Sequence, residues 1–310
     1  MKYINNKLKH YPDRLADYLK DVPPQPVTAQ IQIIDKCCFG CFYCDKEIGK
    51  WDRIEADEKL ISRLKELGVR SVILTGGEPL MHKNFDSMML EFSKHFKVGL
   101  VTTLYRYSEV LETVPTWVKV SLDSVNPAEY GAIKGINPKM LATVLENMKR
   151  LYDNKDPEMV LGAQMVITDH NQTLETIEET LETVKDSCDY LQLRPIESLE
   201  DYEYSDDVHE LLRHVEDKYE KIVISDKFYV KQKHSKCYAK WMQLLIGTDS
   251  NVKICCNRVH ETVASLYDPN LLQIIHDMKL DMKKCYTPCV MSVYNQYISE
   301  SISGPHQEFV

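Results

Sequence analysis

Cys37, Cys41 and Cys44 lie within eight residues of one another, with the spacing C-x3-C-x2-C. Cysteine thiolates are soft ligands that hold iron–sulfur clusters, and three thiols this close can meet only if the backbone curls around a bound group. A cubane cluster has four irons, so this loop would leave one iron without a protein ligand. The spacing therefore predicts a [4Fe–4S] cluster whose open iron can be chelated by a small molecule.

Two other kinds of metal site, a ferredoxin-type cluster and a zinc site, are alternatives for these cysteines. Cys38, Cys41 and Cys44 also read C-x2-C-x2-C, which begins the bacterial ferredoxin motif, but that motif continues with x3-C-Pro and residues 45–48 contain neither residue. A zinc finger or ribbon needs a second ligand pair at short distance, and none follows. We therefore assign the three ligands to Cys37, Cys41 and Cys44 and interpret Cys38 as a bystander.

A second segment, Gly76-Gly77-Glu78-Pro79, follows the apolar run 71–74 and precedes a helical pattern. A lone Gly-Gly pair is usually only a turn. At the end of a strand, however, glycines allow a ligand to approach the backbone closely. The position of this segment makes it a candidate for binding a cofactor.

The cysteine spacing followed by Gly-Gly-Glu-Pro resembles the radical S-adenosylmethionine (radical SAM) superfamily. The resemblance implies that the loop cluster binds S-adenosylmethionine and that residues 76–79 contact its methionyl amino group. It also implies that the aromatic residue before the third cysteine, Tyr43, packs on the adenine. Many relatives carry Thr-Asn-Gly after the third strand, where this chain has Thr102-Thr103-Leu104. This departure from the family pattern leaves open whether that loop contacts the cofactor.

Polar residues at the ends of two further strands complete the cofactor site that the resemblance implies. Ser121 and Asp123 would contact the ribose and the methionine carboxylate, although Ser121 is equally compatible with an ordinary loop start. Arg194 would hold the cofactor carboxylate or an acidic group of the substrate. A surface ion pair is the alternative for Arg194, but its place on an apolar strand favours the functional interpretation.

A second group of cysteines occupies the last third of the chain. This part of the chain resembles the twitch domain, a short relative of the SPASM domain. Its order is a cysteine, a predicted hairpin, a cysteine, a helix and a cysteine pair. The resemblance implies a second, auxiliary [4Fe–4S] cluster with four ligands, Cys237, Cys255, Cys285 and Cys289. Cys256 could replace Cys255, and a zinc site built from the same four thiols is the alternative.

The elements that must position these residues alternate between strand and helix. Strands are predicted at 27–34, 69–74, 98–102, 117–123, 160–167 and 190–194, and helices at 55–67, 85–95, 107–113, 141–152 and 174–185. Strands separated by helices of this length indicate parallel βα units. With the resemblance, they predict an α/β fold, a partial (β/α)6 TIM-like barrel. Each predicted cofactor motif follows a strand, where barrels place their chemistry.

Composition shifts divide the chain into three predicted parts. Residues 1–26 form an N-terminal lead-in with a short helix at 12–20, and residues 27–200 form the radical SAM partial barrel. Residues 201–310 form a bridging helix at 208–219 and a small C-terminal iron–sulfur domain of the twitch/SPASM type. That domain is predicted to contain a hairpin at 244–255 and a helix at 269–283.

The bulk composition narrows the class of protein. The net charge of −9 and the sequence pI of about 5.6 make a general nucleic-acid binder unlikely on charge alone, because such proteins need a basic surface. No run of eighteen apolar residues predicts a membrane helix, and residues 1–6 do not read as a signal peptide. We therefore expect a cytoplasmic protein whose ten cysteines are ligands rather than disulfides.

The resemblance implies an enzyme in which the reduced cluster cleaves S-adenosylmethionine, and the resulting 5′-deoxyadenosyl radical abstracts hydrogen from an unactivated C–H bond. A flavodoxin- or ferredoxin-type protein would donate the electron. Because residues 1–26 are too short for a leader-binding domain, we expect an oxidoreductase that dehydrogenates or rearranges a small metabolite, such as a sugar or cyclitol derivative. The second cluster could accept the substrate electron.

Two alternatives remain open from the sequence. The first is radical epimerisation or crosslinking of a ribosomally made peptide. An epimerase needs a thiol that returns hydrogen to the substrate, and Cys188 and Cys256 are the spare candidates besides Cys38. The second is a non-catalytic iron–sulfur or zinc-binding electron-transfer protein, which would have no use for Gly-Gly-Glu-Pro beside an open cluster.

Overall fold

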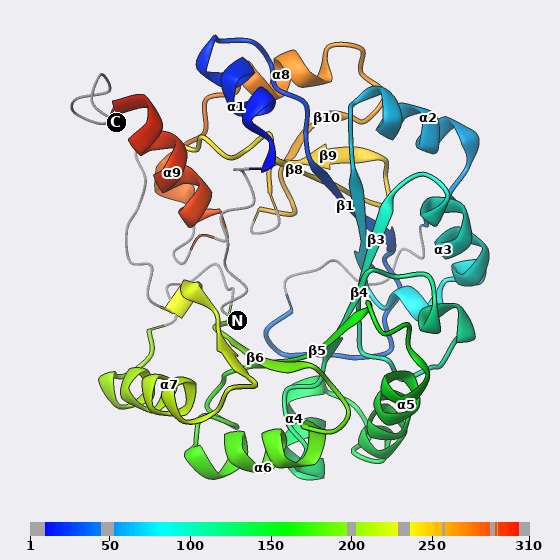
Figure 1. Cartoon of the computed structure of the whole chain (residues 1–310), viewed down its shortest axis with the longest axis vertical. Helices are drawn as coiled ribbons and strands as arrows, with labels where there is room; N and C mark the ends of the chain where they lie inside the picture. The colour runs from blue at the N-terminus through cyan, green and yellow to red at the C-terminus, as the bar shows by residue number, and fades with distance from the viewer. Residues whose placement is uncertain are drawn as a thin grey trace.

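The computed structural model describes residues 10–44, 53–196, 203–228, 236–255, 258–285, 289 and 291–303. Its strands form one sheet in the order β10-β9-β8-β1-β2-β3-β4-β5-β6-β7. Seven strands run parallel in chain order: β1 (Thr28–Ile34), β2 (Ser71–Gly76), β3 (Lys97–Thr102), β4 (Trp117–Ser121), β5 (Val160–Val166), β6 (Tyr190–Arg194) and β7 (Ile222–Ile224). The six predicted strands and the partial barrel are confirmed, and β7 extends the sheet (Figure 1).

The C-terminal part of the chain adds strands to the other edge of the same sheet. Strand β8 (Gln243–Ile246) pairs in parallel with β1, and β9 (Asn251–Lys253) and β10 (Thr262–Ser265) continue antiparallel. The predicted hairpin is therefore β8–β9, and it lies beside the strand that leads into the cysteine loop. The predicted division of the chain at residue 200 stays a prediction.

Helices lie around the outer side of the sheet, and the last of them, α9, stands apart from the strands (Figure 1). They are α1 (Pro12–Leu19), α2 (Glu58–Glu66), α3 (Phe85–Ser93), α4 (Pro127–Lys134), α5 (Met140–Asn154), α6 (Leu174–Val184), α7 (Asp206–Lys218), α8 (Leu271–Asp277) and α9 (Ser292–Ser303). Short 3-10 turns lie at η2 (Pro79–Met81), η3 (Glu109–Glu112), η4 (Asp226–Phe228) and η5 (Met282–Lys284). Among the described helices, none is long and apolar enough to span a membrane.

Two predicted helices are shorter in the structure, and two helices were missed. The helix predicted at 107–113 is only the turn η3 (Glu109–Glu112), which ends before Pro115. The helix predicted at 269–283 ends at Asp277, where the buried Lys240 ammonium donates to the carbonyls of His276, at 2.8 Å, and Met278. Helices α4 and α9 were not predicted.

The two faces of the parallel sheet differ in character. Along β1, β4 and β6, buried residues alternate with half-buried ones. The buried set packs with the helices into the hydrophobic core, and includes Ala29, Ile31, Ile33, Val118, Val120, Leu191 and Leu193. The half-buried set lies on the opposite, inner face and is largely polar: Gln30, Gln32, Lys119, Ser121, Gln192 and Arg194. The barrel therefore presents polar side chains on its inner side.

Two aromatic rings cover the amino-terminal end of this inner face. A Cβ atom at Gly99 would lie 2.3 Å from the Trp117 ring, and one at Gly162 would lie 2.3 Å from the Tyr190 ring. Each glycine is the register partner of the aromatic residue on the neighbouring strand. The glycines thus make room for the rings to lie across β3 and β5.

Candidate functional site

The cysteine loop begins at the carboxyl end of β1 and folds back on itself. The Phe39 amide donates to the Cys37 sulfur at 3.4 Å, and the Cys44 amide donates to the Cys41 carbonyl at 3.0 Å. Burial raises the pKa of Cys37 to about 11, and burial also raises the pKa of Cys41, although the Lys134 charge opposes that shift. Cluster binding must therefore release thiol protons, as expected for thiolate ligands.

The Gly-Gly-Glu-Pro segment holds the base of this loop. The Gly77 amide donates to the Ile34 carbonyl at 2.7 Å, and the Glu78 amide donates to the Lys36 carbonyl at 2.8 Å. Gly76 has φ +135°, and a Cβ at Gly77 would lie 2.2 Å from the Lys36 carbonyl oxygen. The structure therefore requires glycine because two backbones approach closely, directly before Cys37.

The buried Glu78 carboxylate is occupied by protein donors. Oε1 accepts from the Leu80 amide at 3.1 Å and from the Thr102 hydroxyl at 2.5 Å. Oε2 accepts from the Thr103 amide at 2.8 Å and from its hydroxyl at 2.7 Å. Thr102 and Thr103 thus fasten residues 76–79 to the end of β3.

Helix α4, which was not predicted, supports the cysteine loop from the other side. The Gly40 amide donates to the Lys134 carbonyl at 2.9 Å, and the Phe42 amide donates to the Ile133 carbonyl at 3.3 Å. Gly135 ends the helix at φ +56°, where a Cβ would lie 2.4 Å from the Gly40 carbonyl oxygen. The Asn-Pro start at residues 126–127 and this terminal glycine were the sequence signals for α4.

Asp123 connects α4, β5 and the cysteine loop. Its carboxylate lies 2.7 Å from the Lys134 ammonium, and it accepts hydrogen bonds from the Tyr43 hydroxyl and, at 2.8 Å, from the Val166 amide. Both members of the ion pair are fully buried, and Asp123 has φ +68°. The Asp123 carboxylate therefore holds Tyr43. The predicted contact between Asp123 and the cofactor stays a prediction.

Ser121 and Arg194 reach the same edge of the sheet on its inner face. Ser121 is the register partner of Gln164 on β5, and Arg194 pairs with Val166 two residues further along that strand. The Arg194 guanidinium donates to the Gln164 side-chain oxygen at 2.8 Å. The structure thus brings both predicted residues to the carboxyl end of the barrel.

The second predicted site is also assembled. Cys237, Cys255, Cys285 and Cys289 line one cavity together with Lys240 and Arg258. Burial raises the pKa of Cys237 to about 11, and the neighbouring Cys285 and Cys255 thiols add to it. A hydrogen bond with Cys285, followed by burial, raises the pKa of Cys289. The four thiols are therefore near neighbours, whereas Cys256 lies outside the described residues.

Helix α9, the second missed helix, supports this cavity. The buried Asn295 side-chain oxygen accepts from the Tyr238 amide at 2.6 Å and the Ala239 amide at 2.8 Å. Its amide nitrogen lies 3.9 Å from the Cys237 sulfur. Asn295 thereby fixes the two residues that directly follow one predicted ligand, and no sequence signal indicated this role.

The two thiol sites lie at opposite ends of the β1–β8 pair. Residues 28–31 pair in parallel with residues 243–246, so Cys237 approaches from the amino-terminal end of the pair. Cys255 follows the antiparallel strand β9 back to that same end. The cysteine loop leaves from the carboxyl end of β1. At about 3.3 Å per residue, the seven residues of β1 separate the two ends by roughly 20 Å.

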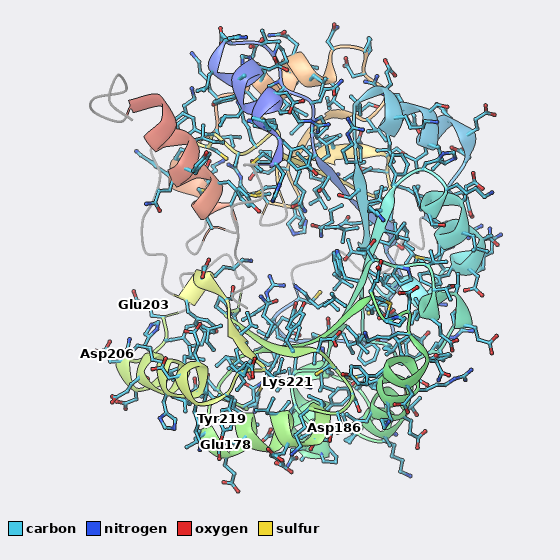
Figure 2. The ribbon with its side chains drawn as sticks, viewed as in Figure 1. Glu178, Asp186, Glu203, Asp206, Tyr219 and Lys221 are labelled. Carbon is cyan, nitrogen blue, oxygen red and sulfur yellow. The ribbon has the colours of Figure 1, made fainter. Side chains whose placement is uncertain are left out.

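The predicted hydrogen-donor thiol Cys188 lies elsewhere. Cys188 is fully buried, precedes β6 at its amino-terminal end, and contacts the Val184 carbonyl through its sulfur at 3.3 Å. Lys221, labelled in Figure 2 beside α6 and α7, donates to the Cys188 carbonyl at 3.1 Å. Chemistry in such barrels takes place at the carboxyl ends of the strands, and Cys188 lies at the opposite end. Its role as a hydrogen donor stays a prediction.

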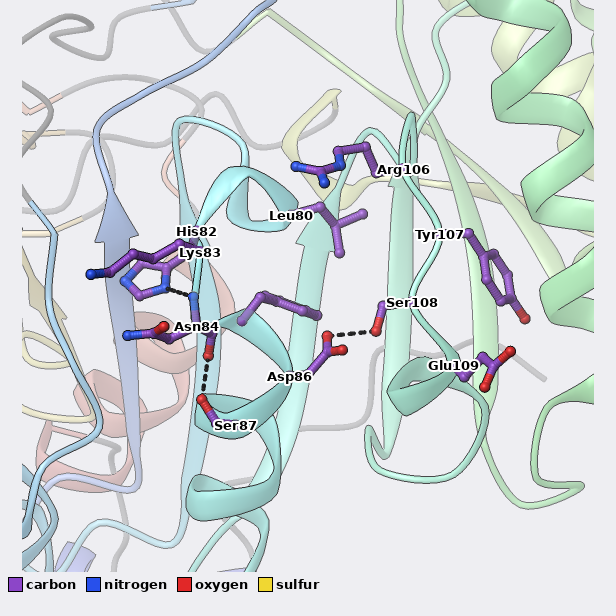
Figure 3. Close-up of a pocket in the computed structure, with 11 residues that line it drawn as sticks. Leu80, His82, Lys83, Asn84, Asp86, Ser87, Arg106, Tyr107, Ser108 and Glu109 are labelled. Carbon is purple, nitrogen blue, oxygen red and sulfur yellow. Dashed lines mark hydrogen bonds between the residues drawn. The ribbon is translucent and has the colours of Figure 1, made fainter.

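A surface pocket lies between the segment after β2 and the segment after β3 (Figure 3). It spans about 620 Å³ and is crossed by a hydrogen bond from the Ser108 hydroxyl to the Asp86 carboxylate at 2.6 Å. His82 contributes to its wall, where its Nδ1 accepts from the Asn84 amide at 3.1 Å. None of the described lining residues is a predicted cluster ligand, so this pocket is separate from the cofactor site.

The loop residues fit an iron–sulfur cluster by their chemistry. The donor set consists of soft thiols, and the surrounding carboxylates of Glu78 and Asp123 are already engaged by protein donors. No three His, Cys, Asp or Glu side chains of the described segments are placed to bind a single metal ion together. A cubane cluster places each thiolate on a different iron, which spreads the ligands more widely than a single ion does.

Comparisons with known proteins identify the family of this chain. Residues 31–184 match the model of the Radical SAM superfamily. The probable GTP 3′,8-cyclase of Archaeoglobus fulgidus is 35% identical over 126 residues, which cover 38% of this chain and 43% of that protein. The GTP 3′,8-cyclase of Brucella ovis is 32% identical over 120 residues, covering 34% and 35%. The aligned part spans less than half the length of these curated relatives.

Solved structures resemble a larger part of the chain. Streptococcus suis SuiB bound to the precursor peptide SuiA has a TM-score of 0.67 at 17% identity, covering 88% of this chain and 71% of SuiB. The structure of anSMEcpe with bound AdoMet has a TM-score of 0.57 at 16% identity, covering 90% and 84%. At such identities the likeness shows the fold. Together with the family match, it establishes that this chain belongs to the radical SAM superfamily, whose enzymes use a [4Fe–4S] cluster and S-adenosylmethionine.

Proposed function

We propose that this radical SAM enzyme modifies a peptide, and that Cys37, Cys41 and Cys44 hold its cofactor cluster. The observation that carries the proposal is the placement of two thiol sites at opposite ends of the β1–β8 pair, with a polar inner face of the barrel between them. A substrate on that face lies between the site of radical formation and a second redox centre. A simple electron carrier binds no substrate, so it would not need a polar face between two redox centres.

When bound, the cluster supplies the one-electron reduction that cleaves S-adenosylmethionine. The chain's own residues orient the cofactor. Tyr43, fixed by Asp123, is the proposed adenine contact. Because the four acceptor positions of the Glu78 carboxylate are filled, the methionyl amino group is left to the backbone of Gly76 and Gly77. Ser121 and Arg194 are the proposed contacts for the ribose and carboxylate.

The inner face favours a peptide because it is rich in side-chain amides. The Gln243 amide donates to the Gln30 oxygen at 2.6 Å, and the Lys119 ammonium donates to the Gln192 oxygen at 3.0 Å. A glutamine amide both donates and accepts hydrogen bonds, as a peptide group does. SuiB, which resembles 88% of this chain, was crystallised with a precursor peptide. The expected sugar or cyclitol substrate finds no support in the relatives described above.

A nucleotide is the second candidate substrate. The curated relatives with 32–35% identity are named GTP 3′,8-cyclases, although the similarity covers only 34–38% of this chain. Lys119 and Arg194 on the inner face could pair with phosphate groups. The peptide remains the leading proposal because the structural likeness to SuiB covers 88% of this chain, whereas the nucleotide proposal depends on similarity over about a third of the chain.

We further propose that Cys237, Cys255, Cys285 and Cys289 bind a second [4Fe–4S] cluster that accepts the substrate electron. Cys285→Ala should then lower the iron content of anaerobically reconstituted protein by about half, since one of two cubane clusters is lost. Cys188→Ala is the matched control, because Cys188 lies outside both sites and should leave the iron unchanged. Unchanged iron in Cys285→Ala, together with stoichiometric zinc in the wild type, would establish the zinc alternative.

The decisive experiment measures cofactor cleavage. Reconstituted protein is reduced with dithionite in the presence of S-adenosylmethionine, and 5′-deoxyadenosine is quantified. Cys41→Ala should form none while keeping a folded barrel. Addition of a peptide library or of GTP, followed by mass spectrometry, separates the two substrate classes. Undiminished 5′-deoxyadenosine formation by Cys41→Ala would contradict the assignment of the loop cysteines.

A further inference from the structure

Asn295 on α9 is a buried polar residue that presents both ends of its side-chain amide to the segment beginning at Cys237. Its oxygen accepts hydrogen bonds from the backbone amides of Tyr238, at 2.6 Å, and Ala239, at 2.8 Å. Backbone N–H groups only donate, so these two contacts fix which end of the side chain is the oxygen. The other end, the amide nitrogen, therefore faces the Cys237 sulfur as a hydrogen-bond donor at 3.9 Å.

The start of α9 supplies a second donor to the same group of thiols. The Met291 amide, directly before the helix, donates to the Cys289 sulfur at 3.4 Å. The Met291 carbonyl in turn accepts from the backbone amide of Asn295 at 2.9 Å, so the first turn of the helix holds both donors. Cys237 and Cys289 both line the four-thiol cavity. Two of the four predicted ligands thus receive N–H donors from α9.

Packing holds α9 in place independently of the thiols. Ile298, three residues after Asn295, is fully buried and belongs to the hydrophobic core. Residues three apart lie on the same face of a helix, so the packing of Ile298 also directs the Asn295 side chain inward. The donor is therefore held in position by contacts that do not involve the sulfur, as expected of a group that orients and tunes a ligand.

We propose that Asn295 donates a hydrogen bond to the Cys237 sulfur of the auxiliary cluster, and that this bond raises the reduction potential of that cluster. The inference rests on the proposed ligand role of Cys237. Hydrogen bonds to cluster sulfurs stabilise the reduced form, which carries the extra negative charge. A higher potential makes the cluster a better acceptor for the substrate electron. Asn295 is thus a positioning residue that acts through the ligand.

Asn295→Asp tests the inference because it keeps an oxygen for the two backbone amides but loses the N–H donor. The parent protein is Cys41→Ala, in which the auxiliary cluster is expected to be the one that remains, and EPR-monitored redox titration gives its midpoint potential. At about pH 9 the introduced carboxyl is ionised and only accepts hydrogen bonds. We expect reduction to become at least about tenfold less favourable, which lowers the potential by about 59 mV for a one-electron couple. Gln296→Glu, the exposed neighbour on α9, adds the same charge and should leave the potential unchanged.

Asn295→Ala, which removes both ends of the amide, separates donation to the sulfur from support of residues 238–239. Both variants lack the donor, so the potential should fall in each, and either one suffices for the titration. If Asn295 only supports the backbone, Asn295→Asp would keep the parent's iron content and potential while Asn295→Ala lost iron, and that result would overturn the inference. An unchanged potential in both variants at full iron content would do the same. If the parent protein binds no cluster, or only zinc, the proposed function fails first, so the two failures are distinguishable.

Discussion

The buried ion pair between Lys134 and Asp123 yields the most demanding prediction. The two charged groups lie 2.7 Å apart and are both fully buried. Lys134→Met removes one charge and leaves the Asp123 carboxylate with only the Tyr43 hydroxyl and the Val166 amide as partners. Breaking a buried pair in this way costs about 3–5 kcal/mol of unfolding free energy, because an uncompensated charge remains in the interior.

The double substitution separates this charge effect from lost packing. Asp123→Asn combined with Lys134→Met removes both charges, so it should recover about 1–3 kcal/mol relative to the sum of the single substitutions. Lys149→Met is the matched control, because Lys149 pairs with Asp153 on the surface of α5. Losing that exposed pair should cost less than about 0.5 kcal/mol.

Urea unfolding of the apo-protein measures these differences as shifts of the midpoint at constant slope. Iron content after reconstitution provides a second readout, because the Lys134 carbonyl and Asp123 both support the cysteine loop. If Lys134→Met cost no more than Lys149→Met, or if the double variant were as unstable as the sum of its parts, the buried pair would not be holding the loop.

Two further predictions concern the surroundings of the cluster. Gly77→Ala should lower the iron bound at the loop severalfold, because its Cβ would lie 2.2 Å from the Lys36 carbonyl oxygen, whereas a Cβ at Gly40 meets nothing closer than 3.6 Å. Gly40→Ala is therefore the control, and equal iron in both variants would contradict the close approach. Burial lowers the pKa of His82, so the unfolded chain binds that proton first as pH falls. The contribution of neutral His82 to the free energy of unfolding is therefore fully present above about pH 6.5 and is lost as the pH falls below that value. His82→Asn, which keeps an acceptor for the Asn84 amide, should therefore lose less unfolding free energy than the wild type between about pH 7 and pH 5.5, and equal losses would exclude His82 as the cause.

The sequence alone predicted the parts of the site in which local pattern and chemistry coincide. The spacing of the loop cysteines and the glycines after β2 depends on residues close together in the chain. The structure adds the reason for Gly77, which is the approach of the Lys36 carbonyl. The six barrel strands were also predictable, because their apolar runs and intervening helices repeat regularly.

The residues that were missed act through contacts between distant segments. Asn295 holds the chain around Cys237 from 56–57 residues away, and no local pattern marks such an asparagine. Thr103, which follows β3, donates a hydrogen bond to Glu78, which follows the neighbouring strand β2. An aspartate at a strand end suggested ligand binding by Asp123, whereas the structure also pairs this buried carboxylate with Lys134. Pairings of this kind depend on tertiary geometry that spacing does not contain.

The pairing of β1 with β8 also determines when the sheet can be completed during synthesis. The Gln30 and Gln243 side chains that meet across this pair are 213 residues apart in the chain. During synthesis, one edge of β1 has no hydrogen-bonded neighbour until β8 has been made. Unpaired strand edges promote aggregation. A fragment ending before β8 would leave the ribosome with that edge permanently exposed. The carboxyl-terminal third thus covers the edge of β1, the strand that leads into the cysteine loop, and protects it from aggregation.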